Sequence, residues 1–468
     1  MAQIDSRGVV YSTDSEAALA HFETALDRAH SYFGDPFAPA DAALAEDPDF
    51  VMGHCFKAGL MCMATEKGLE PAIRDSVRTA EALWVRANGR ERGHIVAARA
   101  WLDGDLARSV ELYGDVALAH PHDLLAVQLA HLGDFYLGQS QMLRDRVARV
   151  LPHWDESLPG YGYLLGMHAF GLEETNLYGR AEETGRRALE INRRDPWAVH
   201  AVAHVMEMQA RLADGVEWLT SRRDDWAPDN AFAFHNWWHL ALYHLDLQQH
   251  DRVLELYDTA IRPKPSTVAL EMVDAAALLW RLALRGIDVG DRWTELADAY
   301  EPTAEDAHYA FNDAHAMAAF VGAGRSGAAN KLLAAMEARA AQGGTNAMMT
   351  RDVGLPLAKA MQAFGRGNYA RAVDLLLPIR LIAHRFGGSH AQRDLLTLTL
   401  IESAIRAGQG TLARGLAAER TDLKPNSPFS WQLAARAAET AGDASRAEQA
   451  RELASSVNAS IARPRAAA

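Results

Sequence analysis

Two stretches of the sequence carry a pair of histidines four residues apart. The first pair is His200 and His204, and the second is His235 and His239. Residues four apart lie on one face of a helix, one turn above each other. Glu207 extends the first stripe, and the second pair follows the first at about the period of a helical repeat. The spacing therefore predicts one polar site that two equivalent, neighbouring helices share.

Two further stretches repeat this spacing of polar residues. Their members are His308, Asn312 and His315 in one stretch, and His390, Asp394 and Thr397 in the other. The residues around all four stripes are mostly Ala, Leu, Met, Phe and Trp, so polar groups interrupt apolar surfaces. Buried polar groups need partners. Whether the four stripes converge on one cavity depends on how tightly the chain winds.

Histidine pairs of this kind support two kinds of chemistry. Paired imidazoles on a helix suit zinc, iron or nickel, but no His-Glu-x-x-His motif occurs and no cysteine joins the pairs. A bound metal is therefore possible but is not the favoured interpretation, and we assign no residue as a metal ligand. In acid–base catalysis, His204 or His239 would be the base and Glu207 or Asp394 would orient it. Arg393 would bind an anionic group.

Composition and charge narrow the range of partners. The chain has 468 residues, of which 49% are hydrophobic and 23% charged, an ordinary globular profile. The formal charge is −14 and no long basic stripe occurs, so we expect no nucleic-acid partner. No 18-residue apolar stretch is free of charges, and the first residues lack the apolar run of a signal peptide. We therefore expect no membrane span and a cytoplasmic protein.

Cys55 and Cys62 are the only cysteines. In a helix over residues 51–64 they would lie about 10 Å apart along the axis, which is too far for a disulfide. Two free thiols fit a reducing compartment. We expect both to be small buried core residues.

Helical periodicity dominates the chain. Apolar residues recur at spacings of three and four almost throughout. Glycine-containing turns precede a second amphipathic helix at Gly104, Gly179, Gly367 and Gly442. Proline-containing breaks at Pro196, Pro228 and Pro425 indicate new helix starts. This alternation is typical of a tetratricopeptide array with a period near 34 residues. It predicts an all-α, right-handed α-solenoid of degenerate tetratricopeptide-type helix pairs, curled around an interior pocket.

We expect residues 1–468 to form one helical-repeat solenoid. Clear units are missing in 1–50, 264–305 and 341–352, and a soft boundary near 264–268 is left open. The ends, 1–20 and 459–468, are expected to be frayed tails.

Other motif matches fail on their context. The segment 322–327 satisfies G-x-G-x-x-G, but it follows an expected helix instead of a strand and is interpreted as a repeat turn. Ser389 and Gln392 follow two glycines in the pattern of a helix capping box. The sequence contains no Walker A motif, no G-x-S-x-G and no other nucleotide or flavin motif, so the cofactor is unknown.

Four blocks of the sequence resemble the tetratricopeptide repeat protein 38 family in order and spacing. These blocks are 195–207, 235–242, 312–317 and 389–394. The resemblance covers roughly residues 20–440. The resemblance implies an all-helical array of degenerate tetratricopeptide repeats. It does not imply any particular enzymatic reaction for this protein. The blocks contain the same residues as the four polar stripes.

The stripes predict an interior pocket that binds a small molecule or a short peptide. Its candidate ligand-binding residues are His200, His235, Asn236, Trp237, Trp238, Tyr243, His308, Asn312, Asp313, His315, His390 and Arg393. One alternative is an enzyme of hydrolysis or elimination, with or without a metal, that uses His204, His239, Glu207 and Asp394. A second alternative is an open scaffold for protein partners. Enzyme status and oligomeric state are left open.

Overall fold

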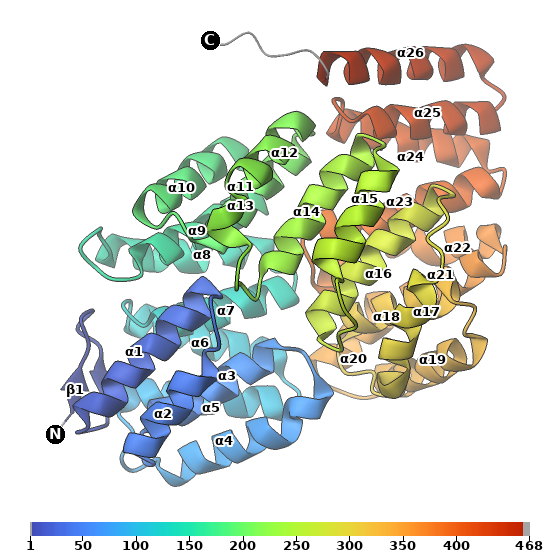
Figure 1. The fold of residues 1–468 in the computed structure, drawn as a ribbon. Coiled ribbons are helices and arrows are strands. Elements are labelled where there is room, and N and C mark those ends of the chain that lie inside the picture. Colours follow the sequence, from blue (N-terminus) through green and yellow to red (C-terminus); the bar gives the residue numbers. More distant parts are fainter. Residues whose placement is uncertain (1, 462–468) are drawn as a thin grey trace.

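The computed structural model describes residues 2–461, and helices make up most of that range (Figure 1). The α-helices are α1 (Glu16–Ser31), α2 (Phe37–Glu46), α3 (Val51–Met63), α4 (Glu70–Ala82), α5 (Gly89–Leu102), α6 (Leu106–Ala119), α7 (Leu124–Tyr136), α8 (Ser140–Val150), α9 (Tyr161–Glu173), α10 (Tyr178–Ile191), α11 (Pro196–Met208), α12 (Leu212–Ser221), α13 (Arg223–Trp226), α14 (Ala233–Asp246), α15 (His250–Leu256), α16 (Ala269–Leu284), α17 (Arg292–Tyr300), α18 (Ala310–Gly322), α19 (Ser326–Ala340), α20 (Thr345–Met349), α21 (Leu355–Gly365), α22 (Tyr369–Leu376), α23 (His390–Arg406), α24 (Gly410–Leu423), α25 (Pro428–Thr440) and α26 (Ala444–Ile461). Short 3-10 or π segments cover Lys67–Leu69, Leu151–His153, Tyr257–Ile261, Glu301–Thr303, Thr350–Gly354 and Ala383–Phe386. The predicted all-α, helical-repeat fold class is confirmed.

Several local predictions about helix ends are confirmed. The Asp195 side chain accepts hydrogen bonds from the first backbone N–H groups of α11, and Pro196 occupies the first helical position. Ser389 and Gln392 form the reciprocal capping box of α23. The glycine-rich segment 322–327 is the turn between α18 and α19.

One predicted turn lies elsewhere. Gly179 is already inside α10, and the backbone reverses at Asn176, whose φ is 62°. Asparagine tolerates this left-handed conformation better than most residues, so it replaces glycine there. At Gly104, with φ at 82°, the prediction is confirmed.

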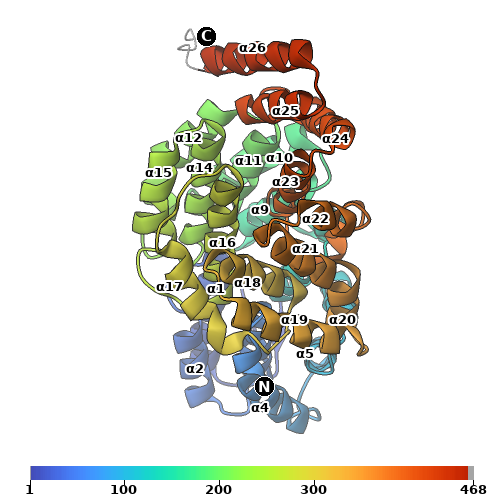
Figure 2. The same ribbon diagram turned by 90° about the vertical axis from the view of Figure 1, so that its right-hand side faces the viewer.

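The chain winds far enough for late helices to contact early ones (Figures 1 and 2). Tyr136 on α7 donates its hydroxyl hydrogen to the carbonyl of Met63 at 2.7 Å, and Tyr309 donates to the carbonyl of Tyr136 at 3.0 Å. The Thr345 N–H donates to the Gly104 carbonyl at 3.1 Å, which joins α20 to the turn before α6. These links close the solenoid around an interior.

Residues 3–20 contain two strands and the start of a helix, contrary to the expected fraying of 1–20, and Met1 lies outside the described residues. Strand β1 (Gln3–Ile4) pairs antiparallel with β2 (Val10–Tyr11), and Tyr11 is buried against α1. At the other end α26 runs to Ile461, and the rest of the expected tail 459–468 lies outside the described residues. Within residues 2–461, none of the helices combines the length and apolar character needed to cross a bilayer.

Candidate functional site

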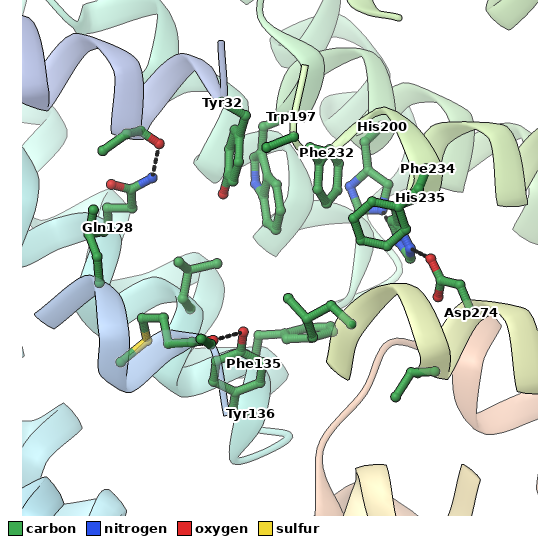
Figure 3. Close-up of a pocket in the computed structure, with 18 of the residues that line it drawn as sticks. Tyr32, Gln128, Phe135, Tyr136, Trp197, His200, Phe232, Phe234, His235 and Asp274 are labelled. Atoms are coloured by element: carbon green, nitrogen blue, oxygen red, sulfur yellow. Dashed lines mark hydrogen bonds and ion pairs between the residues drawn. The ribbon is translucent and has the colours of Figure 1, made fainter. Parts of the chain in front are cut away.

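An internal cavity of about 270 Å³ lies inside the winding (Figure 3). Segments that are far apart in the sequence form its walls: the end of α1, the end of α3, α7, the start of α11, residues 231–235, the start of α16, the start of α18 and the start of α23. Most wall side chains are apolar or aromatic, including Tyr32, Leu132, Phe135, Trp197, Phe232 and Phe311. The winding of the solenoid therefore creates an aromatic-walled cavity, which reaches the surface at the exposed residues Gly34 and Ala231.

Two of the predicted histidines form one end of this cavity. His200 on α11 and His235 on α14 both line it, and Figure 3 shows their rings side by side beyond Trp197 and Phe232. The Nε2 atoms of His200 and His235 lie 3.1 Å apart. The repeat spacing predicts that the two pairs share one polar site, and this contact brings one ring of each pair within hydrogen-bond reach.

The other two histidines continue inward from the cavity wall. His239 Nε2 lies 3.3 Å from His235 Nε2, and the ring of His204 packs against His239 with centroids 4.3 Å apart. We call His200, His204, His235 and His239 the histidine cluster. His204 and His239 are fully buried and do not line the cavity.

Carboxylates contact the outer nitrogens of the cluster. His235 Nδ1 lies 2.6 Å from Asp274 Oδ2, and His239 Nδ1 lies 3.0 Å from Glu207 Oε2. Lys424 approaches the other oxygen of Glu207 at 3.7 Å. Glu207 thus orients His239, in agreement with the pairing we expected for that carboxylate.

Burial sets the charge state of the cluster. It lowers the pKa of His200 and of His239 well below the usual range, and it lowers the pKa of His204 to about 4. Glu173, whose Oε2 lies 3.4 Å from His204 Nδ1, has a pKa raised well above its usual value by burial. At neutral pH these three rings are uncharged and can act as bases or ligands.

The other predicted residues of α14 pack among neighbouring helices instead of lining the cavity. The Trp238 ring stacks on His235, and Tyr243 donates its hydroxyl hydrogen to the Ala203 carbonyl. Asn236 donates to the Pro196 carbonyl, while Trp237 packs on Trp226. None of Asn236, Trp237, Trp238 and Tyr243 lines the cavity.

The third stripe is only partly as expected. His308 precedes α18, which begins at Ala310, so it does not share a helical face with Asn312 and His315. His308 instead faces Glu70 at 3.5 Å in a separate recess. Asn312 does line the cavity and donates to Thr65 Oγ1 at 2.9 Å. The structure brings neither His315 nor its neighbour Asp313 to the cavity.

The fourth stripe does not reach the cluster. His390 and Arg393 lie against Glu174, at 3.8 Å and 3.4 Å. Burial opposes ionisation of Glu174, but the neighbouring His390 and Arg393 keep its pKa below the ordinary value. Asp394 forms a two-bond ion pair with Arg420, so it is not placed to orient a catalytic histidine.

Sequence reasoning missed two carboxylates and most of the aromatic walls. Asp274 lies in α16, which is apolar apart from Glu271, Asp274 and Arg281, and Glu173 ends the mostly apolar helix α9 directly before Glu174, so each carried the signal of a charge in a mostly apolar stretch. The aromatic walls carried no such signal, because aromatic residues in apolar helices are ordinary core residues.

No family model matches the chain. Among solved structures, the human IFIT1 dimer with PPP-AAAA is similar at a TM-score of 0.41 and 13% identity, covering 98% of this chain and 96% of that chain. The same protein with m7Gppp-AAAA gives the same values. Yeast Tom70 is similar at a TM-score of 0.34 and 14% identity, covering 93% of this chain and 96% of that chain.

The ligands of the IFIT1 structures correct our expectation that nucleic acid is not a partner. That expectation rested on the overall charge of −14, which averages over the whole surface and says nothing about one site. The fold itself follows from the helix pairs and their closure. The chain is a helical solenoid of the tetratricopeptide type.

Proposed function

We propose that this protein binds a small, largely aromatic molecule in the internal cavity. The observation that carries the proposal is a concave, aromatic-walled cavity that ends at His200 and His235. Small-molecule sites are concave and mostly apolar, with a few polar groups that fix orientation. A volume of about 270 Å³ lies at the lower end of such sites, which favours a small molecule over a short peptide.

Unsatisfied acceptors in the cavity walls indicate the polar groups of the ligand. Gln128 Oε1 and Asn312 Oδ1 are buried and have no hydrogen-bond partner among the described residues. A buried acceptor without a partner costs about 1–3 kcal/mol. A ligand with N–H or O–H donors would remove that cost. We therefore expect one or two aromatic rings that carry donor groups.

Isothermal titration with 2-naphthol, which has two rings and one hydroxyl donor, tests the proposal. Leu132 lines the cavity and Leu381 is exposed at 79%. Leu132→Trp should fill the cavity and weaken binding at least tenfold, and Leu381→Trp should leave it unchanged. Equal binding by both variants would place the probe outside the cavity and contradict the proposal.

One observation favours enzymatic acid–base chemistry as a second function. Two histidines of the cluster line the cavity, His200 and His235. Of these, only His235 contacts a carboxylate, that of Asp274, which would orient its ring. This geometry favours His235 as the base over His204 or His239. Hydrolysis of 2-naphthyl acetate tests it: His235→Gln should lower the rate about 100-fold or more. If the native protein hydrolyses 2-naphthyl acetate no faster than buffer does, the catalytic function is contradicted and only the binding function stands.

We make three broader proposals, on the family, the domain organisation and the location of the protein. The four blocks at 195–207, 235–242, 312–317 and 389–394 support membership of the tetratricopeptide repeat protein 38 family. Contacts across the stretch 264–268, from Tyr309 to Tyr136 and from Asn312 to Thr65, support one working unit instead of two divided near that stretch. Cys55 and Cys62 are free and buried, which supports a cytoplasmic location.

A further inference from the structure

The four rings of the histidine cluster converge in the manner of a coordination sphere. One nitrogen from each ring lies within 4.8 Å of the others. Two contacts, His200 to His235 and His235 to His239, join Nε2 atoms at 3.1 Å and 3.3 Å. Ligand nitrogens about 2.0–2.1 Å from one tetrahedral ion lie about 3.3 Å from each other. The observed separations match that value.

The protons available in the cluster do not account for these contacts. Asp274 and Glu207 accept hydrogen bonds, so we assign the ring hydrogens of His235 and His239 to Nδ1. The Nε2 atoms of both neutral rings then carry lone pairs. His200 can donate one hydrogen to His235, but the 3.3 Å contact between His235 and His239 still places two acceptors face to face. A cation between them would turn this repulsion into attraction.

His204 shows the same deficit. Both of its ring nitrogens are buried without a hydrogen-bond partner among the described residues. Both oxygens of Glu173, next to His204 Nδ1, are likewise buried and unpartnered. If Nε2 of His204 binds an ion, its Nδ1–H is fixed and can donate to Glu173, which satisfies both side chains.

Carboxylates behind the rings complete the pattern. Histidines that ligate metals almost always donate their other N–H to a carboxylate, a carbonyl or water. Here Asp274, Glu207 and Glu173 stand behind His235, His239 and His204. Asp274 and Glu207 also offset the charge of a divalent cation in a buried site.

We propose that the histidine cluster binds one divalent first-row transition ion of the zinc class through the Nε2 atoms of His200, His204, His235 and His239. Imidazole nitrogens suit zinc, copper, iron and nickel, and they disfavour magnesium and calcium, which prefer oxygen ligands. The ion would lie just behind the wall that His200 and His235 contribute to the cavity. This inference does not depend on the proposed cavity ligand.

Metal analysis of the full chain after incubation with Zn²⁺ and removal of excess ion tests the proposal. We expect one zinc per chain in the native protein and less than 0.1 in His204→Gln and in His239→Gln, on the order of a tenfold or greater loss of affinity. His168→Gln is the matched control, because His168 is a buried helical histidine outside the cluster. Substitution with Co²⁺ should give the intense visible bands of a four-coordinate site.

Two outer-sphere variants keep the test decisive if the ligand variants fold poorly. Asp274→Asn and Glu207→Gln keep all four imidazoles and should weaken Zn²⁺ binding about 10- to 100-fold. The proposal is overturned by a folded native chain that binds neither Zn²⁺ nor Co²⁺ at micromolar concentration. It is also overturned by equal zinc content in the native chain, in His239→Gln and in Glu207→Gln. Binding of 2-naphthol, measured separately, tells this failure from failure of the cavity proposal.

Discussion

His200 and His235 approach to 3.1 Å between their Nε2 atoms, although they come from different helices and are 35 residues apart. The contact joins the aromatic cavity to the buried histidine cluster, because these two rings belong to both. A molecule in the cavity and an ion in the cluster would therefore be separated by one layer of imidazole.

Replacing His204 by leucine separates structural from functional roles. The substitution removes two buried nitrogens that have no partner, so without metal it should leave the thermal midpoint unchanged or raise it. Zinc at 100 times its Kd should stabilise the native chain by about 2.7 kcal/mol and leave His204→Leu unaffected. Thermal melts with EDTA and with Zn²⁺ check both statements. A collapse of His204→Leu in EDTA would show that the ring supports the fold itself.

The Asp394–Arg420 ion pair should be structural. Arg420 is buried, and breaking such a pair leaves an uncompensated charge that costs about 3 kcal/mol or more. We expect Asp394→Ala to lower the thermal midpoint, and Asp394→Leu combined with Arg420→Met to recover most of the loss. Both variants should keep the zinc content of the native chain. Loss of zinc in a folded Asp394 variant would instead tie this residue to the cluster.

The stabilising effect of the Asp394–Arg420 ion pair should be lost at low pH. Arg420 holds the pKa of Asp394 at about 2 in the folded chain, below the ordinary value near 3.8, in spite of the burial that opposes it. Its contribution to stability is therefore present above pH 4 and is lost as the pH falls toward 2. Acid unfolding of the native chain and of the Leu–Met double variant should diverge in that window.

Asp313 should give the opposite dependence on pH. Burial raises its pKa to about 8, with Arg339 opposing and Asp306 adding to the shift. A folded pKa above the unfolded one means that stability is greatest below pH 4 and falls as the pH rises through 8. Asp313→Asn should remove this loss, so its advantage in thermal midpoint over the native chain should grow from pH 5 to pH 8 and level off above pH 9. A constant difference across that range would contradict the assignment.

Gly387 should be required for closure of the solenoid. A Cβ there would lie 2.3 Å from the Tyr309 hydroxyl and 2.5 Å from the Tyr136 carbonyl, and the backbone has φ 88° and ψ −165°, a region suited to glycine. Gly367 also has a positive φ, 73°, but its Cβ would meet nothing within 4 Å. Gly367→Ala should cost about 1 kcal/mol. Gly387→Ala should lower the thermal midpoint several times more and abolish 2-naphthol binding.

Local spacing predicted the contacts that depend on neighbouring helices. The interval between His200 and His235 is one repeat, and adjacent repeats pack side by side, so their contact followed from the sequence. The stripe at His308 failed because the helix begins two residues later, at Ala310. Helix ends are the least certain part of a periodic pattern.

Contacts between distant repeats could not be predicted from the local spacing of residues. Whether Asn312 reaches the same cavity as His200 depends on the winding of the solenoid, which is the sum of many small rotations between neighbouring pairs. Asp394 shows the converse, since its spacing matched the other stripes but its helix turns it toward Arg420. Spacing predicts which residues share a face, and the winding decides what that face meets.

The link from Tyr309 to Tyr136 also has a consequence for synthesis. The two residues are 173 positions apart, so at about 5–20 residues per second the ribosome needs on the order of 10 to 35 seconds to make the second after the first. During that interval Phe135, Trp197 and Phe232 lack the opposite wall that α18 provides. The nascent chain thus carries an open aromatic concavity during that interval, and such exposed apolar surface is prone to aggregation until α18 covers it.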